Sequence, residues 1–241
     1  MLKILYYVYN KISNPRRENK IMIPLKDSVR PRKYPYVNVT LIFLNIAIFI
    51  YQLSLGEAAL IDFFYRYGVI PQNFLALQGN TLLPFLTSIF LHGGWFHLLG
   101  NMLYLWVFGD NVEDRLGHGG YLLFYLAAGA AGSLSHIAAN PQSAIPTIGA
   151  SGAIAGILGA YFIFFPRAKV LTLIPIGIFI TTAHLPAFLF LILWFLLQIL
   201  NAFLAGLSTA TETVAWWAHI GGFVLGFAVG AFTLFRQRLF G

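Results

Sequence analysis

Long uncharged stretches divide this chain and predict its main elements. The charge-free intervals cover residues 34–56, 67–109, 116–166, 170–211 and 213–235. A membrane-spanning helix needs about 20 predominantly apolar residues. The first and last intervals therefore hold one such helix each, and the longer intervals hold one or two with their connections. This pattern predicts six spans, near residues 36–54, 88–108, 119–138, 150–166, 185–206 and 214–235.

The connections between these spans differ in character. About thirty residues after Gln52 are apolar but too interrupted to span, so we expect them to lie in the membrane interface. The charged run Asp110–Arg115 is predicted as an inner loop, and residues 140–143 (Asn-Pro-Gln-Ser) as an outer turn. The basic and aromatic residues 1–21 form either an interfacial helix or a dispensable extension.

Composition supports a membrane protein. Of the 241 residues, 59% are hydrophobic and 10% are charged, whereas soluble domains carry about 25% charged residues. The absence of cysteine excludes disulfides and thiolate metal sites. We therefore predict an all-α membrane protein, a bundle of six transmembrane helices with both termini in the cytoplasm.

The net charge of +7 is explained by topology. Nine of the fifteen lysines and arginines precede residue 34, and with six spans only Arg66 falls on the outer side. This asymmetry agrees with the positive-inside rule. It divides the chain into a basic cytoplasmic segment (1–33), a six-span domain (34–236) and a C-terminal tail (237–241). The alternative, a basic arm for nucleic acid, is disfavoured, and we expect no nucleic-acid partner.

Ser151 and His219 are the candidate catalytic pair. Polar residues inside a membrane are costly and usually functional, and a serine with a histidine is the minimum set for acyl transfer. The stretch from Ser151 to Pro166 makes about 24 Å of helix against a core of about 30 Å, so Ser151 should lie below the outer surface. His219 lies seven residues, about 10 Å, beyond Glu212, at a comparable depth.

Glycine stripes should let the two helices approach closely. Gly226 and Gly230 fall on the same face of span six as His219, within about 20°, and Gly222 flanks them. Span four presents Gly152, Ala155, Gly156 and Gly159. Small residues at this spacing let helix backbones meet in lipid. Packing alone would explain the glycines, but it would not explain a histidine on the same stripe.

A third span carries the remaining polar candidates, His92, His97 and Asn101. On one helix, His97 and Asn101 would lie about 7 and 14 Å below His92. Asn and His side chains can donate to an oxyanion, together with the Ser151 N–H at its helix N-terminus. The alternative is a metal site of His92, His97 and His219, which would lack a neighbouring acid to orient it.

Other polar and aromatic residues receive no catalytic role. No aspartate or glutamate lies inside a predicted span, so the machinery would be a Ser–His dyad and not a triad. His118, His136 and His184 stand near predicted helix ends and are interpreted as interfacial. Trp216 is assigned to an aromatic belt at the membrane surface. We expect no metal and no cofactor.

The motifs resemble those of the rhomboid family of intramembrane serine proteases, from about Met22 to Phe235. The matching segments are Gly149-Ala150-Ser151-Gly152, His92-x4-His97-x3-Asn101, and Ala218-His219-Ile220-Gly221-Gly222 followed by Gly226. The resemblance implies Ser151 as nucleophile, His219 as general base, and His97 and Asn101 in the oxyanion hole. His92, Gly149, Gly152, Gly222 and Gly226 would support the site.

Two positions depart from the pattern of some family members. Ala155 stands where an aromatic residue would stack on the catalytic histidine, so that stacking is absent or supplied elsewhere. A Trp-Arg pair of the outer loop is replaced by Tyr65-Arg66.

The resulting prediction is a serine endopeptidase that cleaves transmembrane segments of single-span membrane proteins within the lipid bilayer. Cleavage would fall near the outer end of the segment, where helix-destabilising residues free a carbonyl. We expect a prokaryotic plasma membrane, with the site opening to the outer side. Two alternatives stay open: a non-catalytic rhomboid-like binding protein, and a transporter that uses the histidines as a relay.

Overall fold

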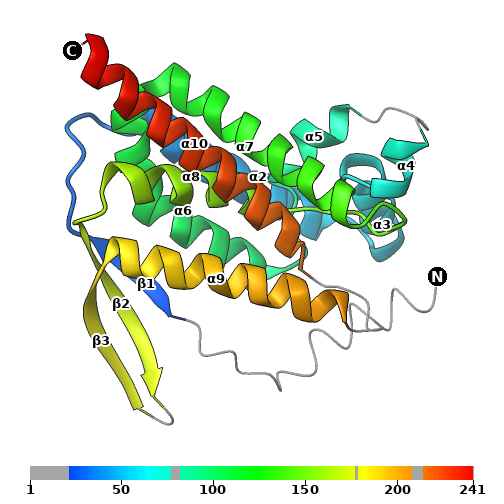
Figure 1. Ribbon diagram of the computed structural model, residues 1–241. Helices are drawn as coiled ribbons and strands as arrows, with labels where there is room; N and C mark the ends of the chain where they lie inside the picture. Colours follow the sequence, from blue (N-terminus) through cyan, green and yellow to red (C-terminus); the bar gives the residue numbers. More distant parts are fainter. Residues whose placement is uncertain (1–21, 77–81, 177–178, 208–213, 241) are drawn as a thin grey trace.

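A bundle of helices with a small sheet at one end forms the fold, as seen in a computed structural model (Figure 1). The structure describes residues 22–76, 82–176, 179–207 and 214–240. The predictions for residues 1–21 and for Glu212 lie outside the described residues. Strand β1 and helices α3, α4 and α5 lie near the two ends of the bundle, and six longer helices run between these ends (Figure 1).

The six longer helices match the predicted spans to within several residues. They are α2 (Tyr36–Ser54), α6 (Trp95–Leu116), α7 (His118–Ala139), α8 (Ser151–Phe164), α9 (Ala187–Gly206) and α10 (Trp216–Phe240). The largest difference is α6, which begins and ends about seven residues later than predicted. Its last two turns contain Asp110 and Glu113, so the predicted inner loop at 110–115 is wrong: these residues are helical.

Four helices are long and apolar enough to cross a membrane: α2, α7, α9 and α10. Helix α8 is apolar but has 14 residues, or about 21 Å of helix. Helix α6 is less apolar because it contains His97, Asn101 and the charged residues of its last turns. The count of six spans and the side on which the termini lie remain predictions.

Helix α8 occupies the centre of the bundle. Eleven of its 14 residues are buried, which is typical of a helix that is hydrophobic on every side. It packs most extensively against α10 and α7. Ser151 opens this helix, so the fold holds the candidate nucleophile at one end of its most enclosed element.

A three-stranded antiparallel sheet closes the opposite end of α8. Strand β2 (Lys169–Ile176) pairs with β1 (Ile23–Asp27) on one side and with β3 (Phe179–Pro186) on the other. The hairpin is rich in the β-branched residues that favour strands. The prediction of an all-α protein is therefore wrong in this detail, although the protein is mostly helical.

Two carboxyl groups, the buried Glu113 and the half-buried Asp27, hold the sheet end together. Glu113 accepts hydrogen bonds from the backbone N–H groups of Val37 (3.0 Å) and Asn38 (2.7 Å), at the start of α2. A carboxylate here also stabilises the helix N-terminus electrostatically. Asp27 of β1 accepts hydrogen bonds from the Tyr161 hydroxyl of α8 and from Asn111 Nδ2 (2.9 Å). These contacts attach α2 and the sheet to the bundle.

At the other end, the segment after α2 folds into α3 (Glu57–Tyr67), α4 (Pro71–Leu75), α5 (Leu83–Thr87) and the 3-10 turn η1 (Ser88–Phe90). It binds the loop that leads into α8. Val69 and Thr147 exchange two backbone hydrogen bonds, of 3.0 and 2.7 Å, and Gly149 N–H donates to the Ser88 carbonyl at 2.9 Å. The predicted turn at residues 140–143 is confirmed, since Ser143 N–H donates to the Asn140 carbonyl.

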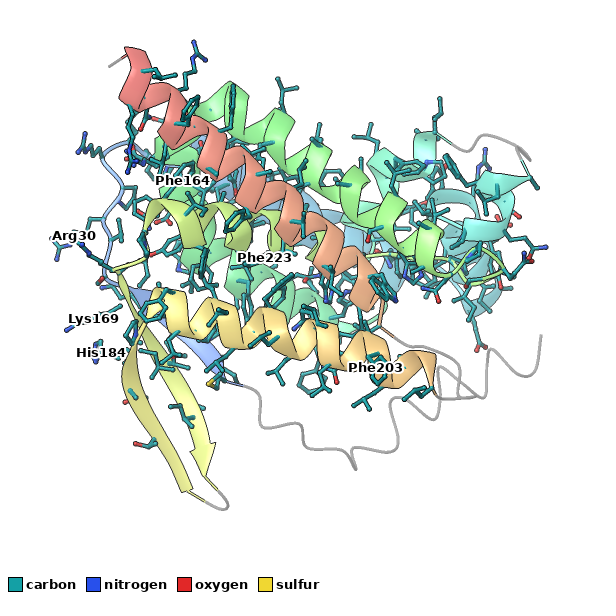
Figure 2. The ribbon with its side chains drawn as sticks, viewed as in Figure 1. Arg30, Phe164, Lys169, His184, Phe203 and Phe223 are labelled. Atoms are coloured by element: carbon teal, nitrogen blue, oxygen red, sulfur yellow. The ribbon has the colours of Figure 1, made fainter. Side chains whose placement is uncertain are left out.

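Basic residues gather at the sheet end. Arg30 and Lys169 lie there, together with His184 of β3 (Figure 2). Arg115 stacks over the rings of Phe164 and Phe165 at the end of α8, with its Cζ 5.4 and 5.8 Å from the ring centroids. Arg66 lies in the last turn of α3, at the other end of the molecule. The distribution agrees with a cytoplasmic sheet end under the positive-inside rule.

Candidate active site

Gly149 shapes the entry to α8. Its φ of +122° lies in the left-handed region that favours glycine. A Cβ at this position would also lie 2.6 Å from His97 Nε2, too close for any other residue. The chain therefore turns sharply before Ser151, whose N–H is one of the first in α8, where N–H groups lack acceptors within the helix.

Glycine contacts bring α8 and α10 together at the level of Ser151 and His219. A Cβ at Gly222 would overlap the Gly152 carbonyl oxygen, and one at Gly226 would overlap the Gly156 carbonyl oxygen. A Cβ at Gly152 would lie 3.5 Å from the Ala218 carbonyl oxygen. Ser151 and His219 each adjoin one of these contact residues, so they lie at the same crossing of the two helices.

His97 of α6 faces the loop before Ser151. The Gly93 N–H donates to His97 Nδ1 at 3.4 Å, so a neutral His97 carries its proton on Nε2. This is the nitrogen that lies against Gly149. Asn101, one turn further along α6, places its Nδ2 3.7 Å from the position of a Gly149 Cβ. Two side-chain donors therefore border the start of α8.

His92 lies outside the helix in which it was predicted. Because α6 begins at Trp95, His92 belongs to the preceding connection, and the estimated depths along one helix do not apply. Asn101 Nδ2 donates to His92 Nε2 at 2.9 Å, which requires a neutral His92 ring. Gln52 of α2 makes two hydrogen bonds with the His92 backbone: its Nε2 donates to the carbonyl at 2.8 Å, and its Oε1 accepts from the N–H at 3.1 Å. The hydrogen bond from Asn101 to His92 thus fixes the orientation of the Asn101 amide.

His219 has neighbours that the sequence analysis did not assign to the site. Its Nδ1 lies 2.9 Å from Gln198 Oε1 of α9. The Trp194 ring lies beside the imidazole, with ring centroids 6.0 Å apart and planes tilted by 33°, and the Trp216 ring is perpendicular to it at 5.9 Å. Trp194 supplies the aromatic contact that Ala155 lacks, and Trp216 contacts the site. A lone glutamine in a strongly apolar helix was the signal that could have identified Gln198.

Of the three histidines interpreted as interfacial, one is buried. His136 is buried at the end of α7, 6% exposed, where Asn140 Nδ2 approaches its Nδ1 at 3.3 Å. His118 binds Glu113, and His184 lies in β3. Among the described residues, no three His, Cys, Asp or Glu side chains are arranged to hold a metal ion, so the three-histidine metal site has no geometric support.

The arrangement has the parts needed for acyl transfer. A serine at a helix N-terminus lies at the same helix crossing as a histidine whose Nδ1 is hydrogen-bonded. Backbone and side-chain N–H donors border the serine, where they could stabilise a developing oxyanion. His219 is 9% exposed and Asn101 8% exposed, so the site is largely shielded within the bundle.

Comparison with known proteins gives a consistent result. The Rhomboid domain family matches residues 79–236. The mitochondrial Rhomboid protein 1 of Saccharomyces cerevisiae is 31% identical over 169 residues, which cover 66% of this chain and 45% of the yeast protein. The Rhomboid protease GluP of Bacillus subtilis is 47% identical over 89 residues, covering 37% of this chain and 17% of GluP.

A plant relative extends the comparison. The chloroplastic Rhomboid-like protein 11 of Arabidopsis thaliana is 30% identical over 132 residues, which cover 55% of this chain and 43% of the plant protein. The chain thus spans less than half the length of these relatives. The family match covers most of the helical bundle, including α6, α8 and α10. This chain is therefore an integral, multi-pass membrane protein that belongs to the rhomboid family.

Proposed function

We propose that this protein is an intramembrane serine endopeptidase, with Ser151 as nucleophile and His219 as general base. The observation that carries the proposal is the contact between α8 and α10 through Gly152, Ala218 and Gly222. It places the serine and the histidine at one helix crossing, although they are separated by a long stretch of sequence. The relative named as a rhomboid protease supports the same reaction class.

The reaction would proceed by two acyl transfers. Ser151 Oγ attacks the scissile carbonyl carbon while its proton passes to His219 Nε2. The oxyanion is stabilised by the Ser151 N–H, His97 Nε2–H and Asn101 Nδ2–H. His219 then gives the proton to the leaving amine. Water, deprotonated by the same imidazole, hydrolyses the acyl-enzyme and regenerates Ser151.

The proposed substrates are single-span membrane proteins, cleaved near one end of the span. Helix α8 is about 9 Å shorter than a hydrocarbon core of about 30 Å. If its sheet end lies at the inner surface, Ser151 lies below the outer surface. A substrate helix must unwind there to expose a carbonyl, so we expect helix-destabilising residues at the cleavage site.

The proposed location is a prokaryotic plasma membrane with the site opening to the outer side. The orientation is supported by the basic residues at the sheet end, including Arg30 and Lys169 (Figure 2). Arg66 lies at the opposite end, beside the Tyr67 ring at 5.6 Å.

A fluorophosphonate probe and a cleavage assay test the proposal together. Purified protein should be labelled at Ser151 and should cleave a single-span substrate in detergent. Ser151→Ala should abolish both activities, and His219→Ala should reduce both by about 1,000-fold or more. Ser54→Ala, at an exposed serine of α2, and His184→Ala, at an exposed histidine of β3, are the matched controls.

Two outcomes would contradict the assignment. Cleavage that persists in purified Ser151→Ala above a no-enzyme control would exclude Ser151 as nucleophile. A folded parent protein that neither labels nor cleaves would favour the non-catalytic binding protein instead.

A further inference from the structure

Gln198 is a buried polar side chain in a strongly apolar helix. It is 6% exposed, and Trp194, Leu197 and Ile199 surround it along α9. Burying an amide without hydrogen bonds is unfavourable, because its lost contacts with water are not replaced. A glutamine at this position therefore needs partners for both ends of its amide, and the structure supplies them.

Both amide atoms of Gln198 are engaged. Its Oε1 lies 2.9 Å from His219 Nδ1, and its Nε2 donates to the Trp194 carbonyl at 2.9 Å. Exchanging the amide oxygen and nitrogen would place Oε1 against another carbonyl oxygen. The Trp194 carbonyl therefore fixes the orientation of the amide, and His219 meets an acceptor.

An acceptor at Nδ1 determines where the imidazole proton lies. Because Oε1 cannot donate, a neutral His219 must carry its proton on Nδ1, which leaves the lone pair on Nε2. This is the tautomer that a general base needs to take a serine proton. In a Ser-His-Asp triad a carboxylate accepts this Nδ1–H hydrogen bond. Helices α8, α9 and α10 contain no acidic residue that could do so.

Helix α9 also restrains the plane of the ring. Trp194, one turn before Gln198, lies beside the imidazole with its ring tilted by 33°, and the Trp216 ring of α10 is perpendicular to it. Phe223, one turn after His219, stacks on Phe195 at 4.3 Å and extends the contact between α9 and α10. In Figure 2, Phe223 lies between these two helices. Gln198 and Trp194 thus both contact the imidazole from α9.

We propose that Gln198 is the positioning residue for His219: it holds the imidazole as the Nδ1–H tautomer, with Nε2 available to Ser151. The inference rests on the proposed function for its catalytic consequence and on geometry for the tautomer. A neutral amide orients the base without stabilising an imidazolium as a carboxylate would. The result is a Ser-His-Gln relay in which the third member comes from α9.

Kinetics test the catalytic consequence. Gln198→Met, similar in size but without the acceptor, should lower kcat by about 10- to 100-fold with little change in KM, since the amide acts on the base and not on substrate binding. Gln198→Glu should restore most of the activity. It should also move the acid limb of the pH profile to higher pH, because a carboxylate favours the imidazolium. Leu197→Ala, at an exposed neighbour on α9, is the control.

The pH readout has few other titratable groups nearby. His97 of α6 and His136 of α7 interact electrostatically with His219, while α8 and α9 carry no charged residue. Both histidines are present in every variant. A shift of the acid limb specific to Gln198→Glu therefore reports that residue 198 acts on the imidazole at Nδ1, while the loss of kcat without a change in KM in Gln198→Met separates positioning of the base from a merely structural role.

Nitrogen-15 NMR of the imidazole tests the tautomer without requiring activity. In the Ser151→Ala protein, His219 should show a protonated Nδ1, and Gln198→Met should give a mixture of tautomers. Subtracting the spectrum of His219→Ala identifies the signals. An unchanged tautomer and unchanged kcat in Gln198→Met would overturn the proposal. An inactive parent protein with a Gln198-dependent tautomer would refute the proposed protease and still support the positioning role.

Discussion

At the scale of single residues, the site depends on how hydrogen-bond partners fix proton positions. The Gly93 N–H donates to His97 Nδ1, which leaves the His97 proton on Nε2. His92 Nε2 accepts from the Asn101 amide, and Gln198 Oε1 accepts from His219 Nδ1. The i, i+4 spacing of His97 and Asn101 predicted that these two side chains share one face of a helix, and both lie beside Gly149, two residues before Ser151. His92 was misplaced because the hydrophobic pattern did not show that α6 starts only at Trp95, three residues after His92.

Asn101→Ala gives a residue-scale prediction. The variant should lose about 10- to 1,000-fold in kcat with little change in KM, because oxyanion donors act mainly in the transition state. His97 and the Ser151 N–H would retain part of the stabilisation. Steady-state kinetics on a single-span substrate measure the effect. A higher KM at unchanged kcat would instead place Asn101 in substrate binding.

At the scale of helices and strands, polarity along the chain predicted most of the architecture. Apolar length identified the six long helices, since each needs to bury or insert an apolar surface. The sheet was missed because residues 169–186 contain few charges and lie between two apolar helices, where a short connection was the simplest interpretation. Strand β1 was missed because its partner β2 lies about 145 residues away, and pairing over that distance leaves no local pattern.

The contact between α8 and α10 gives a prediction at this scale. Gly226→Ala places a methyl group against the Gly156 carbonyl, so the helices must separate. We expect a loss of about 1–3 kcal/mol in stability, together with reduced activity. Gly100→Ala is the matched control, because a Cβ there meets no atom within 4 Å and alanine favours helix by up to about 1 kcal/mol.

Thermal unfolding in detergent, followed by circular dichroism, compares these two glycine variants. Equal melting temperatures for Gly226→Ala and the parent protein would show that the helix crossing tolerates a methyl group. The argument for close approach of Ser151 and His219 would then lose its main support.

At the scale of the whole molecule, α8 links two ends with different chemistry. Ser151 begins the helix next to the loop that follows α7, and Tyr161 near its other end donates to Asp27 of the sheet. Burial raises the pKa of Asp27 above its ordinary value, and the Tyr161 hydrogen bond opposes part of that rise. Lys26 and the carboxyl of Asp110 are the neighbouring charged groups.

This shift predicts how stability depends on pH. A carboxyl group with a raised pKa in the folded state binds its proton more tightly there than in the unfolded chain. Its contribution is therefore present at low pH and is lost as the pH rises through the folded-state pKa. Asp27→Asn should remove this loss, so its melting temperature relative to the parent protein should rise between pH 4 and 7. A constant difference across that range would contradict the assignment.

The position of His219 on the last helix has a consequence for biosynthesis. Chains are made and inserted from the N-terminus, so the nucleophile of α8 enters the membrane before the base of α10 exists. Helix α9 is also inserted before α10, so Gln198 and Trp194, which contact the imidazole in the folded protein, are present before His219. Under the proposed function, Ser151 is therefore inert until α10 is in place, and proteolytic activity appears only then.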